Sequence, residues 1–187
     1  MITSKYNWKN IEKEPDNGFF ELTKKEKLTE LASQILYSRG VDTAEKLIQF
    51  LSTDLSQLHD PYLLHDMDKA VNRIRQAIEN YEQILVYGDY DADGMTSASI
   101  MKEALEMLGA EAQVYLPNRF TDGYGPNESV YKYFIEQQNV SLIITVDNGV
   151  AGNEAIAYAQ SQGVDVIVTD HHGLPAELPE ALSLIHI

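Results

Sequence analysis

A short apolar run is followed directly by three carboxylates in the stretch Ile84-Leu85-Val86-Tyr87-Gly88-Asp89-Tyr90-Asp91-Ala92-Asp93-Gly94. An apolar run of this length, bounded by glycine, is typical of a buried β-strand. A turn after a strand needs one carboxylate rather than three. The presence of Asp89, Asp91 and Asp93 together therefore indicates a role beyond ending the strand.

The strand pattern recurs three times after this stretch, with helical patterns in between. Gly109 and Gly163 stand where helix C-caps belong. Strands that alternate with helices are typical of βαβ units, so the sequence predicts an α/β fold, a mainly parallel sheet with helices on both faces. The further strands are expected at Ala112–Leu116, Leu142–Val146 and Val164–Val168, and the helices near Thr96–Leu108, Glu128–Gln138 and Asn153–Gln162.

Residues 1–80 read as a helical N-terminal segment, and residues 81–187 as the α/β domain. The first helix of the segment is predicted from a capping box and stops at Gly40. The helices of this segment are expected to begin at Thr23-Lys24-Lys25-Glu26, at Asp42-Thr43-Ala44-Glu45 and at about Asp68.

The two ends of the chain carry further signals. Near the start, Tyr6 and Trp8 are an aromatic pair that either packs at the edge of the domain or stacks on nucleic-acid bases. At the other end, Leu184-Ile185-His186-Ile187 begins another apolar run and then stops. We therefore expect the α/β domain to be truncated at its C-terminal side.

The composition favours a soluble, cytoplasmic protein without a membrane partner. No apolar run approaches the roughly 20 residues that a membrane helix needs. The sequence has no cysteine, which excludes disulfides and thiolate-bound metal sites. The formal net charge of −15 argues against a large phosphate-gripping surface, because non-specific nucleic-acid binding relies on lysine and arginine. Bound cations would offset part of this charge in a carboxylate-rich site.

Polar clusters stand directly after three of the four predicted strands. They are the three aspartates of the opening stretch, Asp147-Asn148-Gly149 and Asp170-His171-His172-Gly173. Taken alone, Asp147-Asn148-Gly149 is more typical of a turn than of a site. In an open parallel sheet, however, ligands bind outside the carboxyl ends of the strands, so all three clusters are expected to converge on one edge.

The chemistry that such a cluster supports is metal binding. Carboxylate oxygens with imidazole nitrogen suit manganese or magnesium. Several carboxylates at one place repel one another unless cations neutralise them. Two ions roughly 3.5–4 Å apart are the recurring device for phosphodiester hydrolysis, so we expect two Mn²⁺ or Mg²⁺ ions as cofactors.

Four ordered motifs resemble the DHH phosphoesterase superfamily in its RecJ form. Val86–Ser97 resembles the first motif, Thr145–Gly149 the second, and Val168–His172 carries the Asp-His-His signature. Leu116–Gly125 is similar to a segment characteristic of RecJ, and Asp60–Val71 to the lead-in of bacterial RecJ proteins.

The resemblance implies a role for individual residues. Asp147 is the expected bridge between the two ions, and Asp170 is expected to ligate or to orient other ligands. Arg119 is implied as a phosphate contact, with a structural salt bridge as the equally weighted alternative. The implied metal ligands are Asp89, Asp91, Asp93, Asp147 and His171; the implied catalytic residues are Asp91, Asp93, Asp147, His171 and His172; and the implied phosphate contacts are Arg119, His172 and Thr96, with Ser97 and the start of their helix.

Two departures from the superfamily stand out. Some members have a metal-binding histidine where this chain has Tyr87, so one ion is expected to have a different shell that uses Asp89. The superfamily also has a further ligand aspartate and a second domain, which are expected beyond Ile187. The chain alone is therefore expected to be inactive or weak.

The resemblance implies a metal-dependent exonuclease that hydrolyses single-stranded DNA from 5′ to 3′ in recombination and DNA repair. Its expected partners are single-stranded DNA, a single-strand-binding protein and a helicase. Two alternatives stay open: a DHH phosphodiesterase of short oligonucleotides or cyclic dinucleotides, and a catalytically inactive DHH scaffold module. The sequence leaves open the identity of the metal and the oligomeric state, and the residues by themselves leave the cleavage polarity open.

Overall fold

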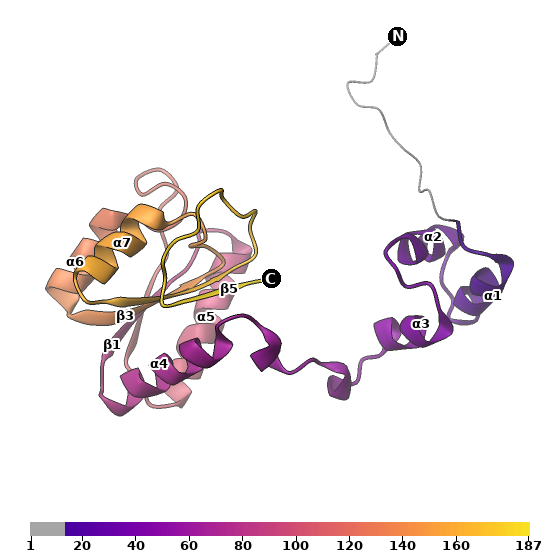
Figure 1. The fold of residues 1–187 in the computed structure, drawn as a ribbon, viewed down its shortest axis with the longest axis horizontal. Coiled ribbons are helices and arrows are strands. Elements are labelled where there is room, and N and C mark those ends of the chain that lie inside the picture. Colours follow the sequence, from indigo (N-terminus) through magenta and orange to yellow (C-terminus); the bar gives the residue numbers. More distant parts are fainter. Residues whose placement is uncertain (1–13) are drawn as a thin grey trace, which may run out of the picture. The chain divides into compact units, whose positions relative to one another are not determined.

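The computed structural model describes residues 14–187, which form two compact units (Figure 1). One unit ends at His59, and the other comprises Asp60–Ile187. The expected boundary at residue 80 is therefore too late, because the helix before the first strand packs with the sheet. Tyr6 and Trp8 lie outside the described residues.

The described part of the first unit is helical, as the sequence predicts. Its helices are α1 (Asn17–Lys25), α2 (Glu30–Ser38), α3 (Ala44–Leu51) and the short η1 (Leu55–Gln57). The start of α3 agrees with the sequence, since the Thr43 side chain caps it by accepting from the backbone N–H of Lys46.

The capping box predicted at Thr23 is wrong. Thr23 lies inside α1, and its hydroxyl is buried against the hydroxyl of Ser33 in α2 at 2.7 Å. The chain turns at Lys27, where φ is 61°, and the next helix is capped by Thr29, which accepts from the N–H of Ala32 at 3.2 Å. Thr23 and Thr29 both precede helix-forming residues, so the sequence offers two positions for the cap of α2. Because the Thr23 hydroxyl is bonded to Ser33, the cap is Thr29.

The second unit is built around one parallel sheet. Within the described residues the strand order is β2-β1-β3-β4-β5, and every neighbouring pair is parallel. The strands are β1 (Gln83–Tyr87), β2 (Ala112–Tyr115), β3 (Val140–Val146), β4 (Asp165–Asp170) and β5 (Ser183–His186). The helices are η2 (Pro61–Leu63), α4 (Met67–Glu79), α5 (Ala92–Met107), α6 (Glu128–Gln138) and α7 (Asn153–Ser161).

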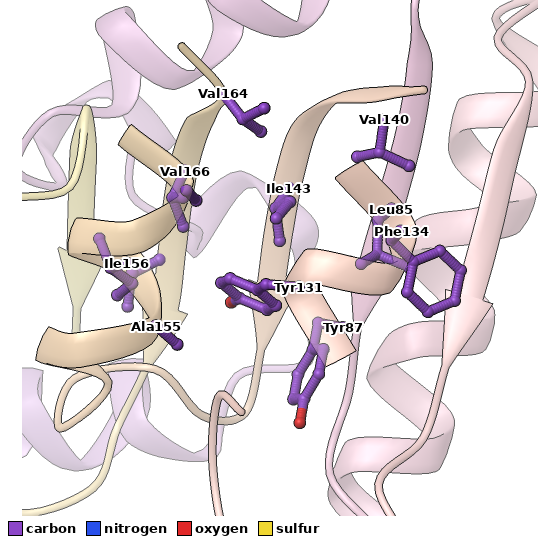
Figure 2. Packing of buried hydrophobic residues seen from close by; sticks show 12 residues of the cluster. Leu85, Tyr87, Tyr131, Phe134, Val140, Ile143, Ala155, Ile156, Val164 and Val166 are labelled. Carbon is purple, nitrogen blue, oxygen red and sulfur yellow. The ribbon is translucent and has the colours of Figure 1, made fainter. Parts of the chain in front are cut away.

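Helices cover both faces of this sheet, which confirms the predicted α/β architecture. Figure 2 shows side chains of α6 and α7, among them Tyr131 and Ile156, in one cluster with Leu85, Ile143 and Val166 of the strands. On the other face, α4 and α5 pack against the alternate strand residues. Gly109 and Gly163 have φ of 88° and 77°, as expected after the ends of α5 and α7. None of the helices in the described residues is long and apolar enough to cross a bilayer.

Arg73 explains why α4 belongs with the sheet. Its Nε donates to Asp165 at the start of β4, and its Nη2 donates to Glu82 just before β1, both at 2.6 Å. The same Nη2 reaches the carbonyl of Ser141 in β3 at 3.2 Å. This half-buried network, together with the buried Ala70 and Ala77, anchors α4 across the starts of three strands, at the edge opposite the polar clusters.

Candidate metal centre

The three polar clusters converge at the carboxyl ends of β1, β3 and β4, as the sequence predicts. These strands are neighbours in the sheet, so the loops after them lie side by side. Among the described residues, two groups of side chains place their possible ligand atoms within 4.8 Å of one another. One group is Asp89, Asp91 and Asp147, and the other is Asp147, His171 and His172.

Asp147 belongs to both groups and occupies an unusual backbone position. Its φ is 63°, in the left-handed region that aspartate and asparagine tolerate better than most residues. Its N–H donates to the carbonyl of Thr169 in β4 at 3.0 Å, which ties the end of β3 to its neighbour. Oδ1 lies 2.8 Å from Nε2 of His171, while Oδ2 is buried and has no hydrogen-bond partner within residues 14–187.

The electrostatics of Asp147 favour a cation. Burial raises the pKa of its carboxyl, the hydrogen bond with His171 lowers it in part, and the neighbouring Asp91 carboxylate raises it again, so that the net shift is upward. A bound divalent ion would stabilise such a carboxylate, which is costly to ionise and has one buried oxygen without a hydrogen-bond partner among residues 14–187.

The turn after Asp147 holds it in this position. The Asn148 side chain donates to the carbonyl of Tyr87 at 3.3 Å and to that of Val146 at 3.0 Å, which joins the ends of β1 and β3. Gly149 has a φ of 115°, and a Cβ there would lie 2.5 Å from Oγ1 of Thr145. Asn148 and Gly149 therefore have a structural role that supports the candidate ligand Asp147 beside them.

Asp91 and Asp89 are placed by the start of α5. Asp91 is the N-cap of this helix, and its Oδ1 accepts from the N–H groups of Asp93 and Gly94, both at 3.0 Å. Asp89 is 2% exposed and accepts from the N–H of Tyr90 at 2.7 Å. Gly94 packs so closely on Asp89 that a Cβ would lie 2.4 Å from its nitrogen, so only glycine fits there.

Asp170 orients the two histidines rather than joining either group. Its Oδ1 accepts from the N–H groups of His171 and His172 and pairs with Nδ1 of His172 at 2.8 Å, and its Oδ2 accepts from the N–H of Val150. Burial would raise the pKa of Asp170, but these hydrogen bonds outweigh it and the net shift is downward. The hydrogen bond with Asp170 raises the pKa of His172. With Nδ1 engaged, His172 has Nε2 left for the site.

Asp93, Thr96 and Arg119, which the resemblance also implies, lie outside both groups. Asp93 is exposed in the first turn of α5. The Thr96 hydroxyl donates to the carbonyl of Ala92 at 2.7 Å, within its own helix. Arg119 stacks on the ring of Tyr90, with its guanidinium carbon 4.8 Å from the ring centre, and forms no ion pair with any described residue.

Tyr87 faces away from the carboxylates. Its side chain is fully buried among Tyr115 and Tyr131 on the α6 face of the sheet, and its hydroxyl donates to the carbonyl of Gly125 at 2.9 Å. Burial raises the pKa of Tyr87, so the phenol stays neutral. Tyr87, which stands at the position of the family's additional histidine, therefore links the core to the loop before α6 by this hydrogen bond.

Aromatic rings that the sequence analysis did not single out connect this loop to the centre. Tyr124 packs edge-on against His172, with ring centres 5.6 Å apart, and against Tyr90 at 6.5 Å. Tyr124 belongs to the segment that resembles RecJ, but its proximity to the histidines arises from the fold, because the segment follows the edge strand β2.

Comparison with known proteins agrees with the motifs. A family model described as the DHH family, N-terminal domain, matches residues 83–187. The single-stranded-DNA-specific exonuclease RecJ of Bacillus subtilis (strain 168) is 42% identical over 186 residues, covering 100% of this chain and 23% of that protein. RecJ of Escherichia coli (strain K12) is 38% identical over 161 residues, covering 85% of this chain and 27% of that protein. The chain thus spans about a quarter of the length of these relatives.

Solved structures show the same likeness. A crystal structure of exonuclease RecJ bound to manganese is 32% identical with a TM-score of 0.60, over 66% of this chain and 31% of that one. RecJ from Thermus thermophilus in complex with Mn²⁺ is 26% identical with a TM-score of 0.63, over 90% of this chain and 23% of that one. The family model covers more than half of the 187 residues, and the motifs that it matches converge in space. The resemblance to RecJ is therefore confirmed, and the chain belongs to the DHH family, with residues 83–187 as its N-terminal domain.

Proposed function

We propose that this chain provides metal-binding residues of a single-stranded-DNA exonuclease that uses two divalent ions, Mn²⁺ or Mg²⁺. The observation that carries the proposal is Asp147, whose carboxylate is shared by two ligand groups and keeps one buried oxygen without a partner in the described residues. A carboxylate has one oxygen for each of two ions, so the bridging role fits its position.

The two groups define where each ion would be held. Asp89 and Asp91 would share one ion with Asp147, and His171 would share the other. When bound, the ions would activate water and stabilise charge on the attacked phosphate. Tyr87 stands where some family members have a histidine ligand, but its side chain is buried in the core. Asp89 would therefore take the place of that histidine as a ligand. Asp93 is retained as a ligand on the family resemblance alone.

The remaining residues would position the substrate. The raised pKa of His172 favours the protonated form, which would donate from Nε2 to a phosphate oxygen, while Asp170 holds Nδ1. Arg119 lies over the ring of Tyr90, which is the residue between Asp89 and Asp91 in the chain. Its guanidinium group has a planar fork that matches phosphate geometry. Thr96 is kept as a phosphate contact on the family resemblance alone, because its hydroxyl is bonded to the carbonyl of Ala92 within α5.

The comparisons support this reaction over the alternatives. The relatives carry the name single-stranded-DNA-specific exonuclease, and two of the similar structures were solved with manganese. The 5′-to-3′ polarity, the roles in recombination and repair, the single-strand-binding protein and helicase partners, and the cytoplasmic location follow from the family likeness and stay proposals. An inactive scaffold would be free to lose ligands, yet both groups are intact.

The test is Asp147→Asn in the full-length protein, by which we mean this chain with the remainder that its relatives carry. Asparagine keeps the shape and tolerates the positive φ, but it removes the charge that two ions would share. We expect manganese-dependent hydrolysis of single-stranded DNA to fall by roughly 100-fold or more. We expect the metal-free melting temperature to stay the same or to rise, because a buried carboxylate beside Asp91 is removed.

The matched control is Asp68→Asn, which removes an exposed carboxylate of α4 outside both groups. Its activity should equal that of the wild type. Activity of Asp147→Asn within threefold of the wild type would contradict the bridging role. A preference of the wild type for cyclic dinucleotides over single-stranded DNA would move the proposal to the phosphodiesterase alternative.

A further inference from the structure

His186 lies on β5, beside the Asp-His-His signature at the end of β4. The two strands are parallel, and their register places His186 opposite Asp170. The N–H of Ile187 continues this pairing by donating to the carbonyl of Asp170 at 3.2 Å. The side chain of His186 reaches further, because its Nε2 lies 2.6 Å from the carbonyl oxygen of His172. A strand outside the three polar clusters thus contacts the candidate centre.

The acceptor in this contact decides which ring nitrogen of His186 is protonated. A carbonyl oxygen accepts and cannot donate, so Nε2 carries a proton and donates it. The neutral ring in this tautomer makes the bond, and no change of charge is needed. The contact is therefore a directed hydrogen bond from β5 to the backbone of His172.

This bond completes the attachment of His172 to the fold. On the N-terminal side, Oδ1 of Asp170 accepts from the N–H of His172 at 3.0 Å and pairs with its Nδ1 at 2.8 Å. On the C-terminal side, residues 173–178 are largely exposed, and a Cβ on Gly173 would have no atom within 4 Å. Among the described residues, the His186 side chain is the hydrogen-bond partner that holds the His172 carbonyl where this open loop begins.

Fixing the carbonyl of His172 also fixes the direction of its ring. A residue that is bonded at both its N–H and its carbonyl has both adjacent peptide planes set, so little rotation remains about its Cα. Its ring then packs on His171, with ring centres 4.7 Å apart, and edge-on against Tyr124 at 5.6 Å. This arrangement keeps His172 in the group that contains Asp147 and His171.

A second side chain of β5 makes a comparable bond away from the centre. The buried Ser183 donates from Oγ to the carbonyl of Asp66, just before α4, at 3.1 Å. Both bonds join β5 to a backbone carbonyl of another segment, but of the two only the bond of His186 ends on the Asp-His-His signature. Ser183 therefore offers a measure of what such a bond contributes to stability alone.

We propose that His186 is a positioning residue, which holds the ring of His172 in the direction from which it contacts the substrate phosphate. This inference rests on the proposed function, in which His172 donates to a phosphate oxygen. In this role His186 touches neither ion nor substrate and acts through the carbonyl of His172. Partners that orient a functional side chain in this way are worth roughly 10- to 100-fold in affinity or activity.

The test measures kcat and KM for single-stranded DNA with manganese in the full-length protein. His186→Ala removes the donor, and we expect kcat/KM to fall by roughly tenfold. His186→Gln keeps an N–H donor at a similar reach, so kcat/KM should return to within about threefold of the wild type. Ser183→Ala is the matched control: it loses its own bond and some stability, but its kcat/KM should equal that of the wild type.

A double variant separates positioning from general stability. In a His172→Ala background the ring that His186 positions is absent, so adding His186→Ala should cause no further loss of kcat/KM. Oligonucleotide binding in the presence of a chelator is measured for the same variants, and we expect the same pattern of losses there without catalysis.

The imidazole ¹⁵N signals of the metal-free chain of 187 residues report the geometry directly. In the wild type, His186 should show a protonated Nε2. In His186→Ala the ring signals of His172 should shift, because its carbonyl has lost its donor, whereas Ser183→Ala should leave them in place.

Two results overturn the inference while leaving the proposed function intact. One is an equal loss of kcat/KM from His186→Ala with and without the His172 ring. The other is a set of His172 ring signals that His186→Ala leaves unchanged. A wild type that hydrolyses no single-stranded DNA with manganese overturns the proposed function instead, and the ring signals then decide the inference by themselves.

Discussion

Single residues at the end of β3 combine a proposed metal ligand with backbone positions that few residues accept. Asp147 and Gly149 both have positive φ, at 63° and 115°, on either side of a buried asparagine. For a residue with a side chain, such as Asp147, a positive φ costs about 1–3 kcal/mol and persists only where the surroundings over-determine it, whereas glycine adopts it freely. Here the hydrogen bonds of Asn148 to β1 and β3 provide that constraint.

Gly149→Ala tests how far this turn depends on glycine. The new Cβ would meet Oγ1 of Thr145 at 2.5 Å and Cγ1 of Val168 at 3.1 Å, and Thr145 cannot retreat because it is buried and donates to the carbonyl of Asn148. We expect the free energy of unfolding, measured with urea, to fall by roughly 2–5 kcal/mol through strain and overpacking.

Gly163→Ala separates the two effects, because Gly163 also has a positive φ of 77° but no atom within 4 Å of the added Cβ. It should lose only about 1–2 kcal/mol, the cost of a left-handed residue with a side chain. Equal losses in the two variants would show that the crowding around Gly149 contributes nothing.

At the scale of elements, the loop between β2 and α6 is attached to the core through Tyr87. In the sequence, Tyr87 stands out because some family members have a histidine ligand at this position. In the structure, its ring packs in the apolar cluster and its hydroxyl donates to the carbonyl of Gly125. The last residue of β1 thereby connects the first motif of the site to the loop that carries Tyr124.

Tyr87→Phe should loosen this loop without damaging the core. The loss of one buried hydrogen bond costs about 0.5–1.5 kcal/mol of stability and leaves the carbonyl of Gly125 without its donor. We expect faster hydrogen exchange at the amides of the loop before α6, while the amides of β1 and β3 keep their protection.

Tyr131→Phe is the control, since Tyr131 is also fully buried and packs on Tyr87 at 5.4 Å, but its hydroxyl has no partner in the described part of the chain. Its stability should stay within about 0.5 kcal/mol of the wild type or rise. Unchanged exchange in Tyr87→Phe would refute the tether.

At the scale of the whole molecule, an acidic chain carries the candidate metal centre, and the substrate that we propose for it is a polyanion. The formal net charge is −15, and the candidate ligands at the carboxyl edge of the sheet include the carboxylates of Asp89, Asp91 and Asp147. Bound divalent ions reduce this charge locally, but capture of single-stranded DNA needs a positively charged groove as well. We therefore assign substrate capture to the remainder that the relatives carry.

The chain of 187 residues on its own should bind manganese but cleave poorly. Millimolar manganese should raise its melting temperature, because a ligand that binds only the native state stabilises it by mass action. The same sample should show little hydrolysis of single-stranded DNA, since the chain spans about a quarter of the length of its relatives and its negative charge repels the substrate.

The control is Asp147→Asn in the same melt, which should reduce the manganese shift. A wild-type chain whose melting temperature does not change with manganese would count against a preformed site. Robust cleavage by this chain would show that the contribution of the remainder is overestimated.

The sequence by itself determined the order of strands and helices, the parallel sheet and the residues at its carboxyl edge. Local signals suffice for these features, because apolar runs, helix caps and the glycines at 109 and 163 act within a few residues of themselves. The resemblance of Val86–Ser97, Thr145–Gly149 and Val168–His172 to the DHH motifs added the chemistry.

Only the tertiary structure decided the features that depend on contacts across the fold. Ser33 selects the cap between Thr23 and Thr29, and Arg73 draws α4 into the sheet unit by bonding to the starts of separate strands. The direction of Tyr87, the engaged hydroxyl of Thr96 and the approach of Tyr124 to His172 likewise follow from packing. A sequence pattern specifies which side chains are polar or apolar, but which partner each one meets is set by elements far apart in the chain, and that is known only once the sheet has assembled.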